Sequence, residues 1–61
     1  MRLRELRERK GLTQKALADR LHMSPPYLSN LERGKANVSL HTLRRLAKAL
    51  KVRVANLVED E

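Results

Sequence analysis

The sequence predicts an all-α fold, a compact bundle of five short helices in one small domain. Leucine and other small apolar residues recur at the three- and four-residue spacing of a helix face, and a serine or threonine suited to helix capping precedes three of these runs. The chain has 61 residues and no cysteine, phenylalanine or tryptophan. Its core must therefore be aliphatic, with twelve leucines as the main source of volume, and disulfides and thiolate metal sites are excluded.

The predicted helices follow one another with short connections. They span residues 1–10, 14–21, 25 or 26 to 33, 40–50 and 54–58. Thr13, Ser24 and Ser39 precede the second, third and fourth helices as N-caps, because a hydroxyl there accepts a hydrogen bond from a free N–H of the first turn. Gly11 and Gly34 end the first and third helices, a position where glycine is common.

Residues that share helical faces are assigned to the interior. They are Leu3, Leu6, Leu17, Ala18, Leu21, Leu28, Leu31, Leu40, Leu43, Leu46, Ala47 and Leu50. Leu12 is expected to pack beneath the junction of the first two helices. Ala18 is small enough to let the third helix approach the second closely.

Residues 14–33, QKALADRLHMSPPYLSNLER, hold the second and third helices, joined by His22-Met23-Ser24. Two helices with so short a link have the layout of a helix-turn-helix, in which the second helix enters the DNA major groove. Pro25 and Pro26 fit the first turn of that helix, where backbone N–H groups have no intrahelical partner.

With this motif, the chain resembles the phage-repressor-like regulators, also called the Cro/repressor or xenobiotic-response-element family. The resemblance covers about residues 3–57 and implies a lambda-repressor-like fold. It rests on Leu6-Arg7, Gly11-Leu12-Thr13-Gln14, Leu17-Ala18, Ser24, Leu28-Ser29, Leu31-Glu32-Arg33-Gly34-Lys35, Ser39-Leu40 and residues 43–50. His22 departs from the pattern, since relatives usually carry glycine in that slot, which needs a positive φ; we expect a mildly strained turn.

The charge balance favours a polyanionic partner. Fourteen Lys and Arg against seven Asp and Glu give a net charge of +7. Three of the acids form a tail at residues 59–61, so the predicted domain, residues 1–58, carries +10. So basic a domain points to nucleic acid, although a solvated, heavily charged surface such as thermostable proteins carry is the alternative.

Contact with DNA needs residues that position the protein on phosphates and others that read base edges. The phosphate candidates lie at the start of the second helix, where free N–H groups form a phosphate cradle, and around the third. They are Gln14, Lys15, Tyr27, Arg33, Lys35 and Asn37. The resemblance implies the roles of Gln14, Arg33 and Lys35. Tyr27 either reaches a phosphate with its hydroxyl or lies against the scaffold.

With Leu28 and Leu31 turned inward, four residues of the third helix face outward as candidate base contacts. They are Pro25, Pro26, Ser29 and Asn30. Asn30 is the best single candidate, because an asparagine amide can form two hydrogen bonds with adenine. The prolines stand where relatives often carry polar residues; their side chains cannot hydrogen-bond but can pack against a thymine methyl.

The resemblance implies two further features. Arg7 and Glu32 match family positions that form a salt bridge between the first helix and the end of the third. Family members generally bind operators as dimers, with recognition helices about 34 Å apart. An apolar group near the C-terminus either forms a homodimer surface or covers the leucines of the fourth helix. It consists of Val52, Val54, Leu57 and Val58.

Other classes of function find little support. His22 and His41 stand far apart in sequence, with no cysteine and no carboxylate at ligand spacing, which argues against a metal site. No catalytic constellation, cofactor motif or small-molecule site is evident, so the chain is not expected to be an enzyme. There is no long apolar run for a membrane span and the N-terminus is charged, so a cytoplasmic location is expected.

The sequence thus predicts a domain that binds double-stranded DNA sequence-specifically and acts as a transcriptional regulator. Within that class, YLSNLERGKANVSL is also similar to small controller proteins of restriction–modification systems. The rival from another class is a protein-interaction module of the same fold, of antitoxin or adaptor type, whose basic face is incidental.

Overall fold

The computed structural model describes residues 1–59, and over these residues the fold is all-α without a strand, as the sequence predicts. The helices are α1 (Leu3–Arg9), α2 (Gln14–Leu21), α3 (Pro25–Glu32), α4 (Leu40–Leu50) and α5 (Val54–Val58). α1 and α3 are slightly shorter than predicted, because Arg2, Lys10 and Arg33 are flanking cap residues rather than helical ones. Of the predicted acidic tail, Asp60 and Glu61 lie outside the described residues.

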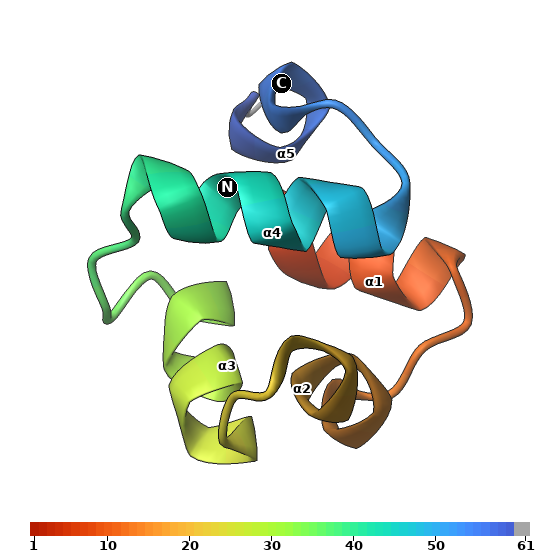
Figure 1. Cartoon of the computed structure of the whole chain (residues 1–61), viewed down its shortest axis with the longest axis vertical. Helices are drawn as coiled ribbons and strands as arrows, with labels where there is room; N and C mark the ends of the chain where they lie inside the picture. The colour runs from red at the N-terminus through yellow and green to blue at the C-terminus, as the bar shows by residue number, and fades with distance from the viewer. Residues whose placement is uncertain (60–61) are drawn as a thin grey trace.

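The helix pair α2–α3 forms one side of the bundle. Figure 1 shows α4 across the middle of the molecule, with α5 on one side of it and α2 and α3 on the other. α2 packs against α3 and α4, α4 against α5, and α1 against both α3 and α5. The start and end of the described chain meet where the Arg2 N–H donates to the Leu57 carbonyl over 2.7 Å.

The interior is aliphatic, as composition requires. Its largest fully buried side chains are Leu3, Leu17, Leu28, Leu31, Leu46, Leu50 and Leu57. Ala18 is fully buried too, and its small side chain allows α2 to lie close to its neighbours. Leu12 is half-buried and packs against this core, as expected.

The structure corrects two sequence assignments. Leu40, predicted to face the interior, is 54% exposed. It is the first residue of α4, and the buried part of that helix lies further along, at Leu46, Ala47 and Leu50. Leu57 cannot belong to a dimer surface, because it is fully buried and anchors the short α5 in the core.

The helix starts match the predicted caps. The hydroxyls of Thr13, Ser24 and Ser39 each accept a hydrogen bond from the N–H three residues later, over 3.0, 3.2 and 3.1 Å. Each cap residue has an extended backbone, as an N-cap requires. These three local hydrogen bonds fix where α2, α3 and α4 begin.

Four helices end on a residue in the left-handed region, and only two of these residues are glycine. They are Gly11 (φ 70°), His22 (φ 56°), Gly34 (φ 73°) and Lys51 (φ 58°). In each case the residue that follows the left-handed one donates its N–H to the carbonyl of the residue five positions before it, over 2.8–3.1 Å. This is the Schellman pattern. The positive φ of His22 was predicted from the glycine of relatives, whereas nothing in the sequence marked Lys51.

Candidate nucleic-acid interface

The turn between α2 and α3 is fixed by backbone hydrogen bonds. The His22 N–H donates to the Asp19 carbonyl over 3.2 Å and the Met23 N–H to the Ala18 carbonyl over 2.9 Å. Ser24 then caps α3, so each of the three residues between the helices takes part in a hydrogen bond. α3 follows this turn directly, and its Leu28 and Leu31 are buried in the core.

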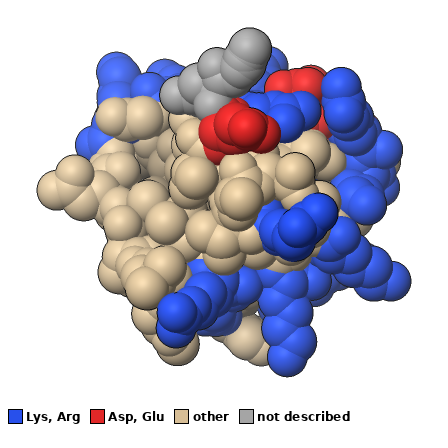
Figure 2. Space-filling model, turned by 90° about the horizontal axis from the view of Figure 1, so that it is seen from above, with Lys and Arg blue, Asp and Glu red and all other residues tan. Residues whose placement is uncertain are grey.

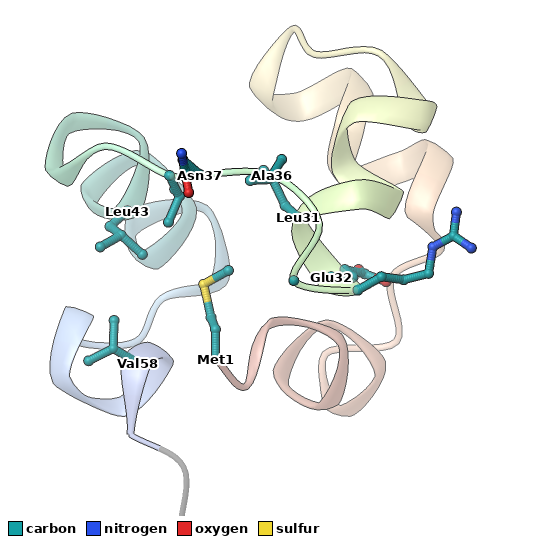
Figure 3. Close-up of a pocket in the computed structure, with 10 residues that line it drawn as sticks. Met1, Leu31, Glu32, Ala36, Asn37, Leu43 and Val58 are labelled. Carbon is teal, nitrogen blue, oxygen red and sulfur yellow. The ribbon is translucent and has the colours of Figure 1, made fainter.

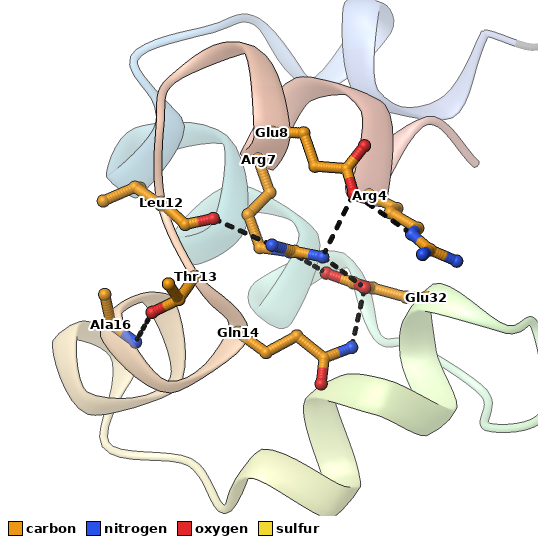
Figure 4. A network of polar contacts seen from close by, with 8 residues as sticks. All are labelled: Arg4, Arg7, Glu8, Leu12, Thr13, Gln14, Ala16 and Glu32. Atoms are coloured by element: carbon orange, nitrogen blue, oxygen red, sulfur yellow. Dashed lines mark hydrogen bonds and ion pairs between the residues drawn. The ribbon is translucent and has the colours of Figure 1, made fainter.

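A buried ion pair joins α1 to the end of α3. Arg7 Nε donates to Glu32 Oε2 over 2.5 Å and Arg7 Nη2 to Glu32 Oε1 over 3.2 Å (Figure 4). The two side chains are only 8% and 2% exposed. The hydrogen bond to Glu32 raises the pKa of Arg7; burial opposes this and the negative charge of Glu32 adds to it. The structure thus pairs the two side chains that the resemblance placed together.

Gln14 is a third member of this network that sequence reasoning missed. Its Nε2 donates to Glu32 Oε1 over 2.9 Å, and Arg7 Nη1 donates to the Leu12 carbonyl over 2.8 Å. Figure 4 shows the three side chains converging where α1, the start of α2 and α3 meet. No buried side-chain nitrogen or oxygen of the described residues lacks a hydrogen-bond partner. The start of α2 is therefore held against α3 by a satisfied polar network.

The outward side of α3 carries the residues predicted to read bases. Pro25 and Pro26 are exposed, and Ser29 and Asn30 are half-buried. Helical spacing places Pro26, Asn30 and Arg33 along one stripe, opposite the buried leucines. None of these candidates lies in the interior.

The predicted phosphate contacts fall into two groups around α3. Gln14 and Lys15 stand at the first two positions of α2, and Arg33, Lys35 and Asn37 follow the end of α3. Lys15 pairs with Asp19 over 3.0 Å on the surface, where 78% of its side chain remains accessible. Tyr27 is 37% exposed, which fits neither a fully extended side chain that reaches a phosphate nor one packed wholly against the scaffold.

The pattern of ion pairs leaves this region cationic. The four acidic side chains of residues 1–58 all pair with nearby cations, Glu5 and Glu8 on α1, Asp19 on α2 and Glu32 on α3. Arg33 and Lys35 have no carboxylate within ion-pair distance among the described residues. The exit of α3 therefore carries two cations that no carboxylate of residues 1–59 neutralises by direct contact.

One further positioning contact comes from α4. Arg45 donates from Nη2 to the Leu21 carbonyl at the end of α2. This contact ties the turn of the helix pair to α4, from a residue 24 positions away in sequence. No local feature of the sequence distinguishes Arg45 from the other cations of α4.

A pocket of about 670 Å³ lies beside the exit of α3. Figure 3 shows Met1, Leu43 and Val58 around it, with Ala36 and Asn37 of the α3–α4 loop on the other side. Met1 and Val58 are 37% and 45% exposed. On the α5 side of the molecule, uncharged residues cover the middle of the surface and Lys and Arg gather along its edges (Figure 2).

Metal-binding and membrane-spanning features are both missing from residues 1–59. No three His, Cys, Asp or Glu side chains come together there as a metal-binding group. None of the helices has the length and apolar character that crossing a membrane requires.

Comparison with known proteins gives consistent matches. The sequence pattern of the helix-turn-helix family matches residues 3–57. The HTH-type transcriptional regulator DdrOP3 of Deinococcus deserti is 50% identical over 58 residues, which are 95% of this chain and 45% of that protein. The immunity repressor protein of Bacillus phage phi105 is 38% identical over 60 residues, 98% of this chain and 42% of the repressor. The chain thus spans less than half the length of these two relatives.

A solved structure is similar over nearly the whole chain. It is the restriction-modification controller protein C.AhdI from Aeromonas hydrophila, with a TM-score of 0.86 and 45% sequence identity. The match covers 92% of this chain and 85% of the controller protein. The similarity therefore extends to sequence as well as to fold.

Proposed function

The chain belongs to the helix-turn-helix family, and from this we propose that it binds double-stranded DNA sequence-specifically and acts as a transcriptional regulator. α3 enters the major groove, as the second helix of this motif does. The observation that supports this proposal best is the stripe of Pro26, Asn30 and Arg33, which faces outward while Leu28 and Leu31 hold the helix in the core.

Positioning on the duplex comes from both ends of the helix pair. The N–H groups of Gln14 and Lys15 precede the first hydrogen bond within α2, which Leu17 makes to the Thr13 carbonyl, and they are suited to a phosphate. Arg33 and Lys35 provide cations at the exit of α3, with Asn37 beside them. Phosphates on both sides of the groove are thereby bound while α3 lies between them.

Gln14 has a double role in this proposal. The hydrogen bond that its side-chain amide donates to Glu32 uses one of its two N–H donors and leaves the other for a phosphate. Because Glu32 is itself held by Arg7, the amide of Gln14 is oriented before DNA arrives. The network thus sets the distance between a phosphate-binding residue and the reading helix.

Two copies are required to read two half-sites. The molecule measures 25 × 24 × 18 Å, whereas successive major grooves on one face of DNA lie about 34 Å apart. We place the interface between copies on the exposed apolar residues near α5 and the start of α4. They are Met1, Leu40 and Val58, with the half-buried Val52 and Val54 beside them.

The proposal is tested by measuring binding to duplex DNA by fluorescence anisotropy over a range of salt concentrations. Asn30→Ala combined with Arg33→Ala should abolish specific binding, because the double variant lacks a reading side chain and a phosphate-binding cation. Arg20→Ala, at the opposite end of α2 from Gln14, is the matched control and should bind nearly as well as the natural chain. Equal binding by both variants would contradict the proposal.

The likeness to a controller protein favours a second candidate, regulation of restriction–modification genes. Both candidates use the same interface and place the chain with DNA in the cytoplasm. They are separated by whether the selected DNA sites lie beside restriction and modification genes. If the chain is instead a protein-interaction module, replacing Asn30 and Arg33 should leave its binding to the partner protein unchanged.

A further inference from the structure

The first turn of α3 has no backbone N–H available to a ligand. Pro25 and Pro26 occupy its first two positions and carry no N–H. The Tyr27 N–H donates to the Ser24 hydroxyl over 3.2 Å, and the Leu28 N–H donates to the Ser24 carbonyl over 3.1 Å. The first three positions of the helix, where N–H groups normally have no intrahelical partner, are therefore closed at Pro25, Pro26 and Tyr27.

The other capped helices differ in this respect. α2 and α4 begin with the same cap geometry, Thr13 and Ser39 accepting from the third N–H of each helix. Their first two residues are not proline, so those N–H groups remain free of intrahelical bonds. The front of α3 is thus chemically unlike that of α2, which we assign to a phosphate.

The surface at the front of α3 is apolar and rigid. Pro25 and Pro26 are exposed, and their rings cannot rotate away as longer side chains do. The nearest polar side chain on the same stripe is Asn30, one turn further along. The part of the first turn formed by Pro25 and Pro26 therefore presents hydrocarbon, and along this stripe the first polar side chain is Asn30.

Few groups in the major groove suit such a surface. Base edges there consist of hydrogen-bond acceptors and amino donors, except for the methyl group at C5 of thymine. A donor or acceptor covered by proline would lose its water without gaining a partner. A methyl group covered by proline loses only unfavourable exposure to water.

We propose that Pro25 and Pro26 read pyrimidine C5-methyl groups, so that the DNA site carries thymine opposite the front of α3. This inference rests on the proposed function, since it requires α3 in the major groove. Under this inference α3 recognises bases in two ways, by apolar contact at its first turn and by hydrogen bonds at Asn30. 5-Methylcytosine carries the same methyl group and is the other base with this chemistry.

The test compares bases that differ by the methyl group alone. A site is first selected from a random duplex pool, and each thymine facing the front of α3 is then replaced by uracil, which keeps every hydrogen-bonding group. Binding should weaken by about fourfold for each methyl removed. The affinity for a site with 5-methylcytosine at the same position should exceed that for cytosine by a similar factor. If the methyl group strengthens binding only on thymine, recognition of the methyl group alone is wrong.

Two variants show which residues are responsible. Pro25→Ser with Pro26→Ser keeps residues that helices accept at these positions, and it should bind thymine and uracil sites equally. Arg20→Ala, outside the proposed interface, keeps both prolines and should retain the fourfold ratio. Thermal melts of both variants check that the fold is intact.

The outcomes separate this inference from the function beneath it. If the selected duplex binds and uracil matches thymine, or if selected sites lack thymine opposite the front of α3, the methyl reading is wrong and DNA binding stands. If no duplex binds at low salt, the proposed function itself fails.

Discussion

Arg7 and Glu32, twenty-five residues apart in sequence, form a bidentate ion pair that is almost entirely shielded from water. Glu32 stands one turn beyond the buried Leu28 on α3 and its carboxylate is shielded from water, so it adds no negative charge to the face proposed for DNA. Gln14 completes the network from α2. One acidic side chain thus sets the positions of three helices around the proposed interface.

Replacing Glu32 by alanine should destabilise the domain by about 3–5 kcal/mol, because Arg7 is left buried without its partner. A chain of this length has a total stability of only about 3–9 kcal/mol, so a large unfolded fraction is expected. Urea unfolding at neutral pH measures the change. Asp19→Ala, which removes an exposed pair with Lys15, should cost about 1 kcal/mol or less. Equal costs would show that the buried pair contributes no more than a surface one.

Two residues other than glycine adopt the left-handed conformation, and replacing either by glycine should raise the free energy of unfolding. His22→Gly and Lys51→Gly should each add about 1 kcal/mol, since glycine adopts this conformation without the steric cost of a side chain. The melting temperature should rise by about 4–8 °C in each case. Lys48→Gly, inside α4, is the matched control and should lower stability by about 1 kcal/mol. A lower melting temperature for His22→Gly would argue against strain in the turn.

Two leucines of α4 differ in burial, since Leu46 is fully buried and Leu40 is mostly exposed. Leu46→Ala should cost about 2–5 kcal/mol, because it opens a cavity in the core. Leu40→Ala should change the stability of the monomer by less than about 0.5 kcal/mol, since that side chain is mostly in solvent. Analytical ultracentrifugation of the same variants should show weakened self-association for Leu40→Ala. Unchanged association would remove Leu40 from the proposed surface between copies.

The helix positions follow from short-range chemistry, which explains why they were predictable. Thr13, Ser24 and Ser39 act through hydrogen bonds spanning three residues, and leucine spacing reports the buried face of each helix directly. α2, α4 and α5 span the predicted residues. The outward face of α3 was predictable for the same reason, because Leu28 and Leu31 leave only one side free.

Interactions between distant residues were not predictable from spacing. The hydrogen bond from Gln14 to Glu32 and that from Arg45 to the Leu21 carbonyl depend on how the helices pack. Leu40 shares the apolar character of the buried leucines, yet as the first residue of α4 it is 54% exposed. The Arg7–Glu32 pair was anticipated through the family resemblance alone.

The salt dependence of binding should separate phosphate-binding cations from other cations. Lys35→Ala should reduce the slope of log affinity against log salt by about 0.9, the value expected when one fewer phosphate is neutralised. Lys48→Ala, on the side of α4 that faces the end of α2, should leave that slope unchanged. Anisotropy titrations at several salt concentrations measure both slopes. A slope altered equally by the two variants would place the DNA on a different face.

The most direct test of reading by α3 is the sequence preference of Asn30→Ala. Selection from a random duplex pool, run in parallel for this variant and the natural chain, gives the preference at every position of the site. Loss of an adenine preference at one position in each half-site, with affinity for unrelated DNA and the salt slope unchanged, is the predicted result. An unchanged preference at every position would contradict the assignment of α3 as the reading helix.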